Sequence, residues 1–394
     1  MRIFVLLPRV PYPIEKGDKL RAFHQLRNLA EDHELILCAL SEEKVHPDAY
    51  TELIRFVDNI HFIPVTGMAS AWNIVKAFFT GKPLQVGYYY NKKAQKRIDE
   101  LIDFYQPDHI YAQLIRVAEY VKNHNIPKTL DYQDAFSGNI YRRAKTEFFL
   151  WRPLFYFEAG RLKRYERTIF SAFDHKTIIS APDRDLIDHQ DRSQINIIPN
   201  GVDTGFFYPR EEEKIYDLVF VGNMNYRPNI DGAEYLVRKI LPLVRKQYGE
   251  VRVLLSGANP HPRVRRLSGN GVEVTGWVDD IRDSYRQSKV FIAPMQIGTG
   301  LQNKLLEAMA MKIPSITSSL ANDALEAVDG EEILIGETPQ DYAGHVITLL
   351  QDDNVYTSIA ENGFRFVTEK YDWYKNAEKL TAIMSSTAPP EPSE

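Results

Sequence analysis

Short apolar runs alternate with amphipathic stretches along the chain, and this rhythm constrains the fold more than any other feature. A first series of runs occupies 3–7, 35–40, 60–64, 109–112, 128–131, 176–180 and 195–198. A second series occupies 217–221, 251–256, 272–276, 290–293, 315–317 and 333–335. Strands that alternate with helices form parallel sheets, because each helix returns the chain to the same end of the sheet. The sequence therefore predicts an α/β protein with two parallel sheets.

A segment rich in turn signals separates the two series. Pro199, Asn200 and Gly201 open it, and a charged run at 210–214 follows. The length of 394 residues also favours two domains over one. We expect two Rossmann-like domains at 1–200 and 217–370, joined by a linker at 201–216. We further expect a helix at 371–386 that packs back on the first domain, and a disordered Pro-rich tail at 387–394.

The charge and cysteine content exclude several classes of protein. Lys and Arg total 48 against 53 Asp and Glu, a net charge of −5, which argues against binding nucleic acid through bulk charge. Cys38 is the single cysteine, so an internal disulfide framework and a cysteine zinc cluster are excluded. The first apolar run is too short for a signal peptide, and no run is long enough to span a bilayer. We expect a cytoplasmic protein.

The strongest local signal is a glycine-rich loop after the apolar run at 290–293. Gly298, Thr299 and Gly300 precede a helix that is predicted to begin near Gln302. Backbone N–H groups and the positive end of the helix dipole would then lie at the carboxyl edge of the sheet, where open α/β sheets bind ligands. The loop is therefore a candidate phosphate site.

Two charged residues follow in the same predicted helix. Lys304 adds a positive charge in the first turn, and Glu307 shares its helix face. A carboxylate is a poor phosphate ligand, so we expect Glu307 to accept hydrogen bonds from ribose hydroxyls. An ordinary strand–loop–helix turn with a Lys–Glu surface pair explains the same pattern equally well.

Two other loops follow strands at a carboxyl edge. Gly222 and Asn223 follow the run at 217–221, and Arg227 could neutralise a phosphate there or could be a solvated side chain. In the first domain, Lys16, Gly17 and Asp18 end a polar loop after the first strand. These three residues read either as part of a binding site or as the entry to a helix.

Carboxylates also follow two other predicted strands. Asp131 and Asp134 can serve in acid–base chemistry or acceptor binding, although helix capping is the simpler interpretation for Asp134. Asp183, Arg184 and Asp185 follow a proline at a helix start, where acidic residues are favoured by the dipole, so we expect no metal there. The chain lacks the zinc-helix, Walker and nucleophile-elbow motifs, which disfavours those hydrolases and simple nicotinamide enzymes.

Taken in order, the motifs of the second half resemble the glycosyltransferases of family 4, which have the GT-B fold. The carrying segments are IIPNGVD at 197–203, DLVFVG at 217–222, GWVDD at 276–280, VFIAP at 290–294, LEAMA at 306–310 and VDG at 328–330. Phe207 and Pro209 also fit. The segments GNMNYRPNID at 222–231 and GTGLQNK at 298–304 are similar to those of a bacterial subgroup that assembles exopolysaccharide.

The resemblance implies a retaining, metal-independent transfer of a sugar, without a cofactor, from a UDP- or GDP-type nucleotide diphosphate sugar. The acceptor would be a hydroxyl of a glycan or of a lipid-linked molecule. In the family the donor binds the second domain and the acceptor the first, across a central cleft that both sheets face. Lys16, Gly17 and Asp18 would then lie on the acceptor side.

The resemblance also assigns donor-site positions. Glu307 corresponds to the second of two family glutamates that are eight positions apart, and Thr299 stands where the first would be (307 − 8 = 299). The amides of Gly300, Leu301 and Gln302 would substitute for it. Asn223 replaces a family arginine beside Gly222, and Arg227 and Lys304 would supply the positive charge.

A first-domain histidine of the family has no clear counterpart in this chain. Asp131 and Gln113 both lie at comparable strand ends. The candidate catalytic residues are therefore Lys304, Arg227 and Asp131. Because Thr299 and Asn223 replace charged family residues, a non-catalytic nucleotide-sugar-binding protein remains an alternative, as does an epimerase of the same fold.

One segment of the first domain combines basic and aromatic residues. Residues 142–167 hold eight Lys or Arg and three Glu (8 − 3 = +5) among many aromatic residues. Such a helix can lie on an anionic membrane, which would suit a lipid-linked acceptor. The alternative is a helix that packs its aromatic side chains on the first domain, and Pro153 and Gly160 favour it because they interrupt the amphipathic pattern.

Overall fold

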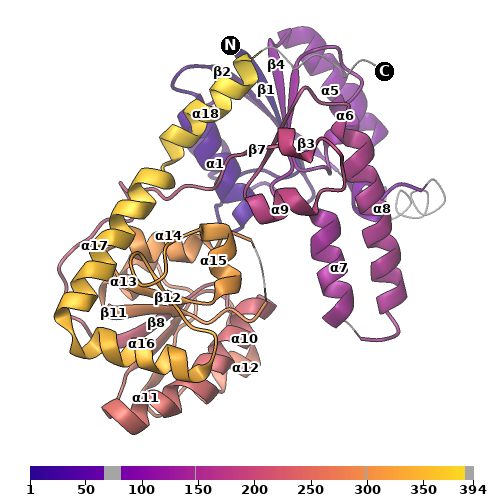
Figure 1. Ribbon diagram of the computed structural model, residues 1–394. Helices are drawn as coiled ribbons and strands as arrows, with labels where there is room; N and C mark the ends of the chain where they lie inside the picture. Colours follow the sequence, from indigo (N-terminus) through magenta and orange to yellow (C-terminus); the bar gives the residue numbers. More distant parts are fainter. Residues whose placement is uncertain (66–80, 147, 298–299, 387–394) are drawn as a thin grey trace. The chain divides into compact units, whose positions relative to one another are not determined.

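The computed structural model describes residues 1–65, 81–146, 148–297 and 300–386 (Figure 1). The chain forms two compact units. The first unit consists of Met1–Pro199 and Trp373–Glu394, and the second of Asn200–Asp372. The predicted tail at 387–394 lies outside the described residues.

The first unit is built on a parallel sheet of seven strands in the order β3-β2-β1-β4-β5-β6-β7. Successive residues of β1 alternate between two cores: Ile3, Val5 and Leu7 face one, and Phe4 and Leu6 face the other. Burial on both faces explains why the strands read as continuous apolar runs. The strands are β1 (Arg2–Leu7), β2 (Glu34–Ser41), β3 (Asn59–Pro64), β4 (His109–Gln113), β5 (Lys128–Asp131), β6 (His175–Ile178) and β7 (Asn196–Ile197).

Helices cover both faces of this sheet. They are α1 (Gly17–Leu29), α2 (Ala49–Leu53), α4 (Leu84–Tyr89), α5 (Lys92–Tyr105), α6 (Ala118–Val121), α7 (Phe136–Thr146), α8 (Arg152–Phe170), α9 (Ala181–Leu186), the short 3₁₀ helix Arg192–Gln194 and α18 (Trp373–Ser385).

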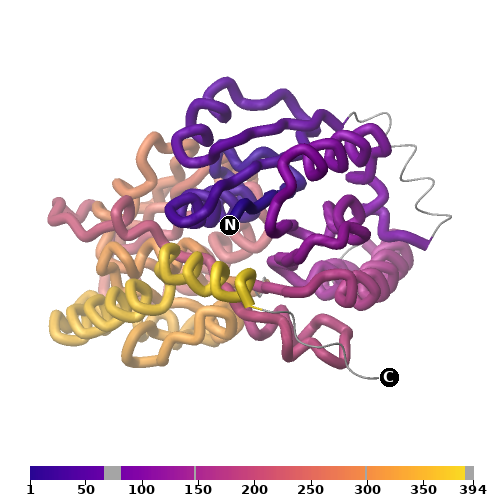
Figure 2. Tube along the Cα trace, turned by 90° about the horizontal axis from the view of Figure 1, so that it is seen from above, coloured from indigo at the N-terminus to yellow at the C-terminus, as the bar shows by residue number. Residues whose placement is uncertain are grey.

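The C-terminal helix α18, yellow in Figure 2, belongs to the first unit and lies beside its N-terminal part. Trp373 stacks on His24 of α1 with ring centres 5.0 Å apart, and Thr381 hydrogen-bonds His33 at 3.0 Å. The chain thus returns to the first unit after completing the second.

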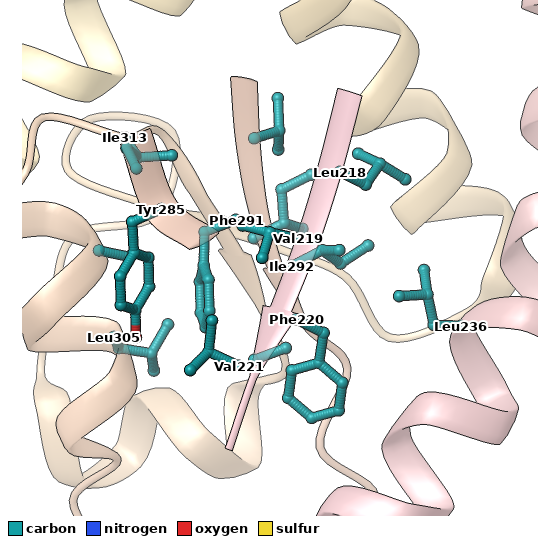
Figure 3. Close-up of a cluster of buried hydrophobic side chains, with 14 of the residues drawn as sticks. Leu218, Val219, Phe220, Val221, Leu236, Tyr285, Phe291, Ile292, Leu305 and Ile313 are labelled. Atoms are coloured by element: carbon teal, nitrogen blue, oxygen red, sulfur yellow. The ribbon is translucent and has the colours of Figure 1, made fainter. Parts of the chain in front are cut away.

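The second unit contains a parallel sheet of six strands in the order β10-β9-β8-β11-β12-β13. Figure 3 shows its core, where Phe220 and Val221 of β8 and Phe291 of β11 lie among Tyr285 and Leu305 from flanking helices. Val202, inside the segment expected as a linker, is buried in the same core. The strands are β8 (Tyr216–Val221), β9 (Val253–Ser256), β10 (Val272–Val274), β11 (Ser288–Ala293), β12 (Ser315–Thr317) and β13 (Leu334–Ile335).

Side-chain caps begin several helices of the second unit. Thr338 and Asp341 form a reciprocal capping box at α16, and Ser318 and Asp352 cap α15 and α17. The helices are α10 (Arg227–Tyr235), the π-helical turn Leu236–Ile240, α11 (Leu241–Tyr248), α12 (Pro262–Arg265), α13 (Ile281–Arg286), α14 (Asn303–Ala310), α15 (Ser319–Leu325), α16 (Pro339–Gln351) and α17 (Asp353–Lys370).

Each sheet has one point at which the strand order reverses. In the first unit this point lies between β1 and β4, and in the second between β8 and β11. Connections leave the two strands in opposite directions there, which opens a crevice at their carboxyl ends. The predicted fold class and all the predicted strands are confirmed, with strand ends shifted by a few residues. The fold therefore marks one ligand-binding edge in each unit.

Candidate functional site

The loops after β8 and β11 meet at the reversal point of the second sheet. The strands run parallel with Leu218 opposite Val290, so α10 and α14 both begin at the carboxyl edge. Helices that begin at such an edge direct their N–H groups and positive dipole ends at it. The candidate donor residues lie on these two loops and helices.

Lys304 extends from the first turn of α14 toward the loop after β8. Its ammonium donates a hydrogen bond to Asn229 Oδ1 and lies 4.9 Å from the centre of the Phe220 ring. Burial against this ring lowers the pKa of Lys304 to about 7, and the nearby Glu307 only partly opposes that shift. With a pKa near neutrality, the Lys304 amine readily gains a proton when an anion binds beside it.

The Glu307 carboxylate binds Tyr285 rather than Lys304. Tyr285 of α13 donates its hydroxyl to Glu307 Oε2 at 2.7 Å. Burial raises the pKa of Glu307, while Tyr285 and Lys304 lower it. No ion pair joins Lys304 and Glu307 in the part of the chain that the structure describes, so the surface-pair interpretation is wrong. Tyr285, which holds the carboxylate in place, was missed because no motif marks it.

Asn229 links the two loops and was also missed. It is 5% exposed, its Nδ2 donates to the Asn223 carbonyl at 2.9 Å, and its Oδ1 accepts from Lys304. A Cβ on Gly222 would lie 2.7 Å from Asn229 Nδ2, so a larger residue there would displace the Asn229 side chain. The long-range contact of Asn229 becomes visible only once β8 and β11 are known to be neighbours.

Asn223 and Arg227 lie at the rim of this edge. Both are exposed, and Arg227, the first residue of α10, lies 3.6 Å from Asp231 with its side chain 56% exposed. An exposed ion pair of this kind contributes little to stability and is readily exchanged for a phosphate. Arg227 stays a predicted phosphate contact.

The glycine-rich loop is described only in part, because Gly298 and Thr299 lie outside the described residues. Gln302 stands at the start of α14, where its Nε2 donates to the Gly300 carbonyl at 2.7 Å. Leu301 packs against the core of the second unit. The side chains of Leu301 and Gln302 are thus engaged within the protein, which leaves backbone amides as the groups to offer a ligand.

Asp131 has a structural position rather than a catalytic one. Its carboxylate accepts from Arg21 Nε at 2.6 Å, from Tyr111 at 2.8 Å and from Thr177 at 3.1 Å. Asp131 and Arg21 are both 0% exposed. With no exposed atom to contact a substrate, Asp131 leaves the candidate catalytic set. Gln113, the other possible counterpart of the family histidine, is buried and donates to the Asp18 carbonyl at 3.3 Å.

The acceptor-side candidates surround the first turn of α1. Lys16 precedes the helix and is exposed, as is Gly17, where a Cβ would meet nothing within 4 Å. Asp18 accepts from Arg9 Nη1 at 2.7 Å. Gly17 is therefore not required by backbone geometry, whereas Asp18 orients an arginine at the carboxyl end of β1.

Asp134 is a further candidate that the sequence assigned to capping. Its carboxylate makes no hydrogen bond or ion pair within the described ranges. Burial and the nearby Asp183 raise the pKa of Asp134 to about 7. Gln133, directly before it, has a left-handed backbone (φ 59°) and a buried Nε2 without a partner. A carboxyl group with this pKa at a strained strand end suits proton transfer at neutral pH.

The described residues contain neither a metal-binding cluster nor a membrane-spanning helix. Among the described residues, no group of three or more His, Cys, Asp or Glu side chains is arranged to hold a metal ion. Within the same residues, no helix combines the length and the apolar character that a membrane crossing requires.

The chain is similar to known proteins both in sequence and in fold. Residues 216–352 match the family described as glycosyl transferases, group 1. The UDP complex of Alr3699/HepE from Anabaena superposes with a TM-score of 0.71 at 13% identity, over 98% of this chain and 100% of that one. The fold is GT-B. Sucrose-phosphate synthase from Thermosynechococcus elongatus has a TM-score of 0.70 at 15% identity, with 97% and 98% of the chains covered.

The chain also has a relative that matches it in sequence over nearly its whole length. An uncharacterized 44.6 kDa protein in the cps region of Klebsiella pneumoniae is 24% identical over 393 residues, which is 94% of this chain and 96% of that protein. The family match covers β8 to α16, and so includes Asn229, Lys304, Glu307 and Tyr285.

The lowered pKa of Lys304 predicts a pH dependence of stability. Between pH 7 and about 10 the unfolded chain binds a proton on this lysine that the folded protein does not, so its contribution to the free energy of unfolding rises with pH. The limit for one proton is about 1.4 kcal/mol per pH unit. We expect urea denaturation of the Lys304→Met variant to show a shallower rise over this range than the unsubstituted protein. Parallel pH profiles would contradict the prediction.

Proposed function

We propose that this protein is a retaining glycosyltransferase that moves a sugar from a UDP- or GDP-type nucleotide diphosphate sugar to a hydroxyl of a glycan or lipid-linked acceptor, without a metal. The observation that carries the proposal is the pair Lys304 and Glu307, held by Asn229 and Tyr285 at the reversal point of the second sheet. The family match at 216–352 and the relative in a cps region support transfer in exopolysaccharide assembly. The cytoplasm, where the sequence places the protein, is the compartment that we propose for this activity.

The proposed chemistry depends on the departing nucleotide diphosphate. As the bond between the sugar and the diphosphate breaks, negative charge develops on the leaving phosphate. Lys304, the amides at the start of α14 and Arg227 would stabilise that charge, which is the main source of catalysis in such sites. Glu307, fixed by Tyr285, would accept hydrogen bonds from the ribose. On the first unit, Asp134 is placed at a strand end where a carboxyl group could take the acceptor's proton.

The proposal is tested by a screen of UDP- and GDP-sugars. Each is added to the purified protein, and both thermal stabilisation and release of the free nucleotide diphosphate are measured, because a ligand that binds the folded state raises its apparent stability. We expect one donor to stabilise the protein and to be hydrolysed slowly in the absence of an acceptor. Binding of no nucleotide sugar would contradict the proposal.

The second candidate is a non-catalytic nucleotide-sugar-binding protein. Asn223, a neutral and exposed residue where the family carries an arginine, is the observation that favours it. Stabilisation by a donor without release of the nucleotide would support this candidate. An epimerase of the same fold would instead convert the donor without any acceptor.

A further inference from the structure

Two arginines meet at the reversal point of the first sheet. Arg9 follows β1 and Arg116 follows β4, and these strands are neighbours. Both guanidinium groups lie against Tyr89: Arg9 Nη2 is 3.3 Å from its hydroxyl, and Arg116 Cζ is 5.3 Å from its ring centre. Two positive charges thus share one aromatic ring at the edge where parallel sheets bind ligands.

Arg116 is held without a carboxylate partner in the described part of the chain. Its Nε and Nη2 donate to Gln85 Oε1 at 3.2 and 3.0 Å, and Phe136 lies below it, with the ring centre 4.9 Å from Cζ. Burial lowers the pKa of Arg116, and so does the neighbouring Arg9. Two of its five N–H groups are used in this way, which leaves three for an incoming acceptor atom.

The backbone before Arg116 is strained in a way that aims this side chain. Leu114 has φ 67°, a conformation that a bulky residue rarely adopts, and its N–H donates to the Asp131 carbonyl at 2.7 Å. Such strain persists only where the surrounding structure holds it, and it concentrates at ligand sites. Here it turns the chain sharply at the end of β4 so that Arg116 reaches Tyr89.

We propose that Arg116 and Arg9 form a subsite for a phosphate group carried by the acceptor substrate. This inference rests on the proposed function, since it specifies the acceptor class. A planar guanidinium matches phosphate oxygens in pairs, and an arginine fixed between two rings needs little ordering to bind. Asp18 forms its ion pair with Arg9, whereas Asp18 and Glu42 act on Arg116 only through their nearby charge, so a ligand phosphate can still pair with the Arg116 guanidinium. A soluble sugar phosphate and a lipid-linked diphosphate both present this chemistry.

Calorimetric titration with inorganic pyrophosphate tests the subsite. The Lys304→Met background is used because it removes the anion site proposed in the second unit. In that background we expect pyrophosphate to bind, and the added Arg116→Gln substitution to weaken binding by at least about tenfold, the loss expected for one charge-assisted contact. Arg55→Gln, an exposed arginine of the same unit that pairs with Glu52, is the matched control and should change nothing.

The outcomes separate the subsite from the donor site. Equal pyrophosphate affinity with and without Arg116 overturns the subsite, as does the absence of binding in the Lys304→Met background. UDP binding to the Arg116→Gln variant is measured in parallel and should match that of the unsubstituted protein. Normal UDP binding by the Lys304→Met variant would instead contradict the proposed donor site. It would not affect the conclusion that the pyrophosphate titration gives for Arg116. If pyrophosphate binds, glucose 1-phosphate and a short-chain polyprenyl diphosphate then distinguish soluble from lipid-linked sources.

A second and independent feature is the tip of the helical hairpin formed by α7 and α8. Figure 1 shows the two helices running side by side away from the first sheet. Four consecutive apolar side chains at the tip are more than half exposed: Phe148 58%, Phe149 64%, Leu150 65% and Trp151 57%. Leu154, Tyr156 and Phe157 continue this surface on α8. The packing interpretation of this aromatic segment is therefore wrong for these residues.

Among the described residues near the tip, the acidic side chains are buried and several basic side chains are exposed. Glu158 is buried and accepts from the Leu84 N–H at 2.7 Å, and Glu166 is buried and bound to Ser137. Arg143, Lys145 and Arg152 are exposed. Every exposed charged side chain among the described residues of 141–160 is thus basic, a polarity that the overall sum of +5 understates.

We propose that the tip of the α7–α8 hairpin docks on an anionic membrane, with Phe148–Trp151 entering the interface and the basic side chains meeting lipid phosphates. Charge complementarity selects this occupant, because the exposed charged side chains that the structure describes around this apolar tip are basic and match an anionic lipid surface. Each basic side chain near such a surface contributes about 1 kcal/mol at moderate salt. Pro153 does not break the surface, since it lies in the first turn of α8.

Co-sedimentation tests the docking surface. We expect the protein to sediment with phosphatidylglycerol-containing vesicles and not with pure phosphatidylcholine vesicles, and added salt to weaken the binding. The Phe149→Ser/Trp151→Ser variant should lose at least about tenfold in affinity, because burial of two large aromatic side chains is removed. Phe104→Ser removes an aromatic side chain that is 78% exposed on α5 and serves as the control.

Unchanged vesicle binding by the Phe149→Ser/Trp151→Ser variant would overturn the proposal, as would no binding by the unsubstituted protein. A dimer in solution that this variant converts to a monomer, without any vesicle binding, would assign the tip to self-association instead. Because UDP binding is not involved, neither outcome depends on the proposed function.

Discussion

The Lys304→Met variant is expected to lose nearly all transfer activity and most of its affinity for the donor nucleotide. The ammonium stands at the carboxyl edge of β8 and β11, where the diphosphate would lie, and methionine keeps the apolar contact with Phe220 while removing the charge. Removal of one group that stabilises developing charge costs on the order of 10²–10³ in rate. Transfer with the donor found in the screen, and calorimetric titration with its nucleotide diphosphate, measure the two effects.

A matched control lies at the other end of the same strand. Lys289, near the start of β11, pairs with Asp217 at 2.9 Å, so Lys289→Met removes a lysine from the same sheet but from its opposite edge. This variant should retain transfer and binding. If Lys304→Met and Lys289→Met have equal activity, Lys304 is not part of the site.

Two substitutions of Glu307 separate the loss of its charge from the loss of its hydrogen bond with Tyr285. Glu307→Gln keeps a carbonyl oxygen for the Tyr285 hydroxyl and removes the charge, whereas Glu307→Ala leaves that buried hydroxyl without its acceptor. If the carboxylate binds the ribose, both variants should raise the KM for the donor, and the alanine variant should also lower the stability. An effect on stability alone would make Glu307 a structural residue.

The strands could be predicted because burial on both faces leaves a direct trace in the sequence. Each strand of the two parallel sheets is an apolar run, and the turn signals after Ile198 separate the two sheets. The same logic located Lys304 and Glu307, since a glycine-rich loop between a buried strand and a helix is a local pattern. Features that depend on a few neighbouring residues are therefore accessible to sequence reasoning.

The remaining site residues depend on strand order, which the sequence does not display. Asn229 contacts Lys304 across 75 positions, and Arg9 reaches Tyr89 across 80. Neither contact has a local signature: the first exists only because β8 adjoins β11, and the second joins the loop after β1 to the last residue of α4. The sequence favoured packing over exposure for the segment that contains Phe148–Trp151 for a related reason: an aromatic run reads as core unless the surface against which it would pack is known.

For Asp131 the sequence predicted the position correctly but the catalytic role wrongly. Its place at the end of β5 was predicted, and such ends often bear catalytic carboxylates. Arg21, 110 positions away, occupies the carboxylate from inside the first unit, and Tyr111 and Thr177 complete its hydrogen bonds. A buried carboxylate needs such partners, because desolvation of an unpaired charge is costly. The structural role of Asp131 depends on Arg21, a partner that sequence spacing could not identify.

This corrected role predicts a large loss of stability when the pair is broken. Asp131→Ala should lower the free energy of unfolding of the first unit by about 3–5 kcal/mol, because the fully buried Arg21 loses the carboxylate bound to its Nε and Nη2. Chemical denaturation followed by circular dichroism measures the change. Glu34→Ala breaks the exposed pair with Arg2 and should cost no more than about 1 kcal/mol.

A double variant separates a structural role of Asp131 from a catalytic one. The double variant Arg21→Met/Asp131→Leu removes both charges and should be more stable than Asp131→Ala, since replacing a buried pair by apolar side chains is often close to neutral. If Asp131 acted on the acceptor, this double variant would fold but lose transfer. We expect the opposite: transfer by each variant should follow the fraction of protein that remains folded, because the groups placed to meet the substrates, Lys304, Glu307, Asp134 and Arg116, are still present.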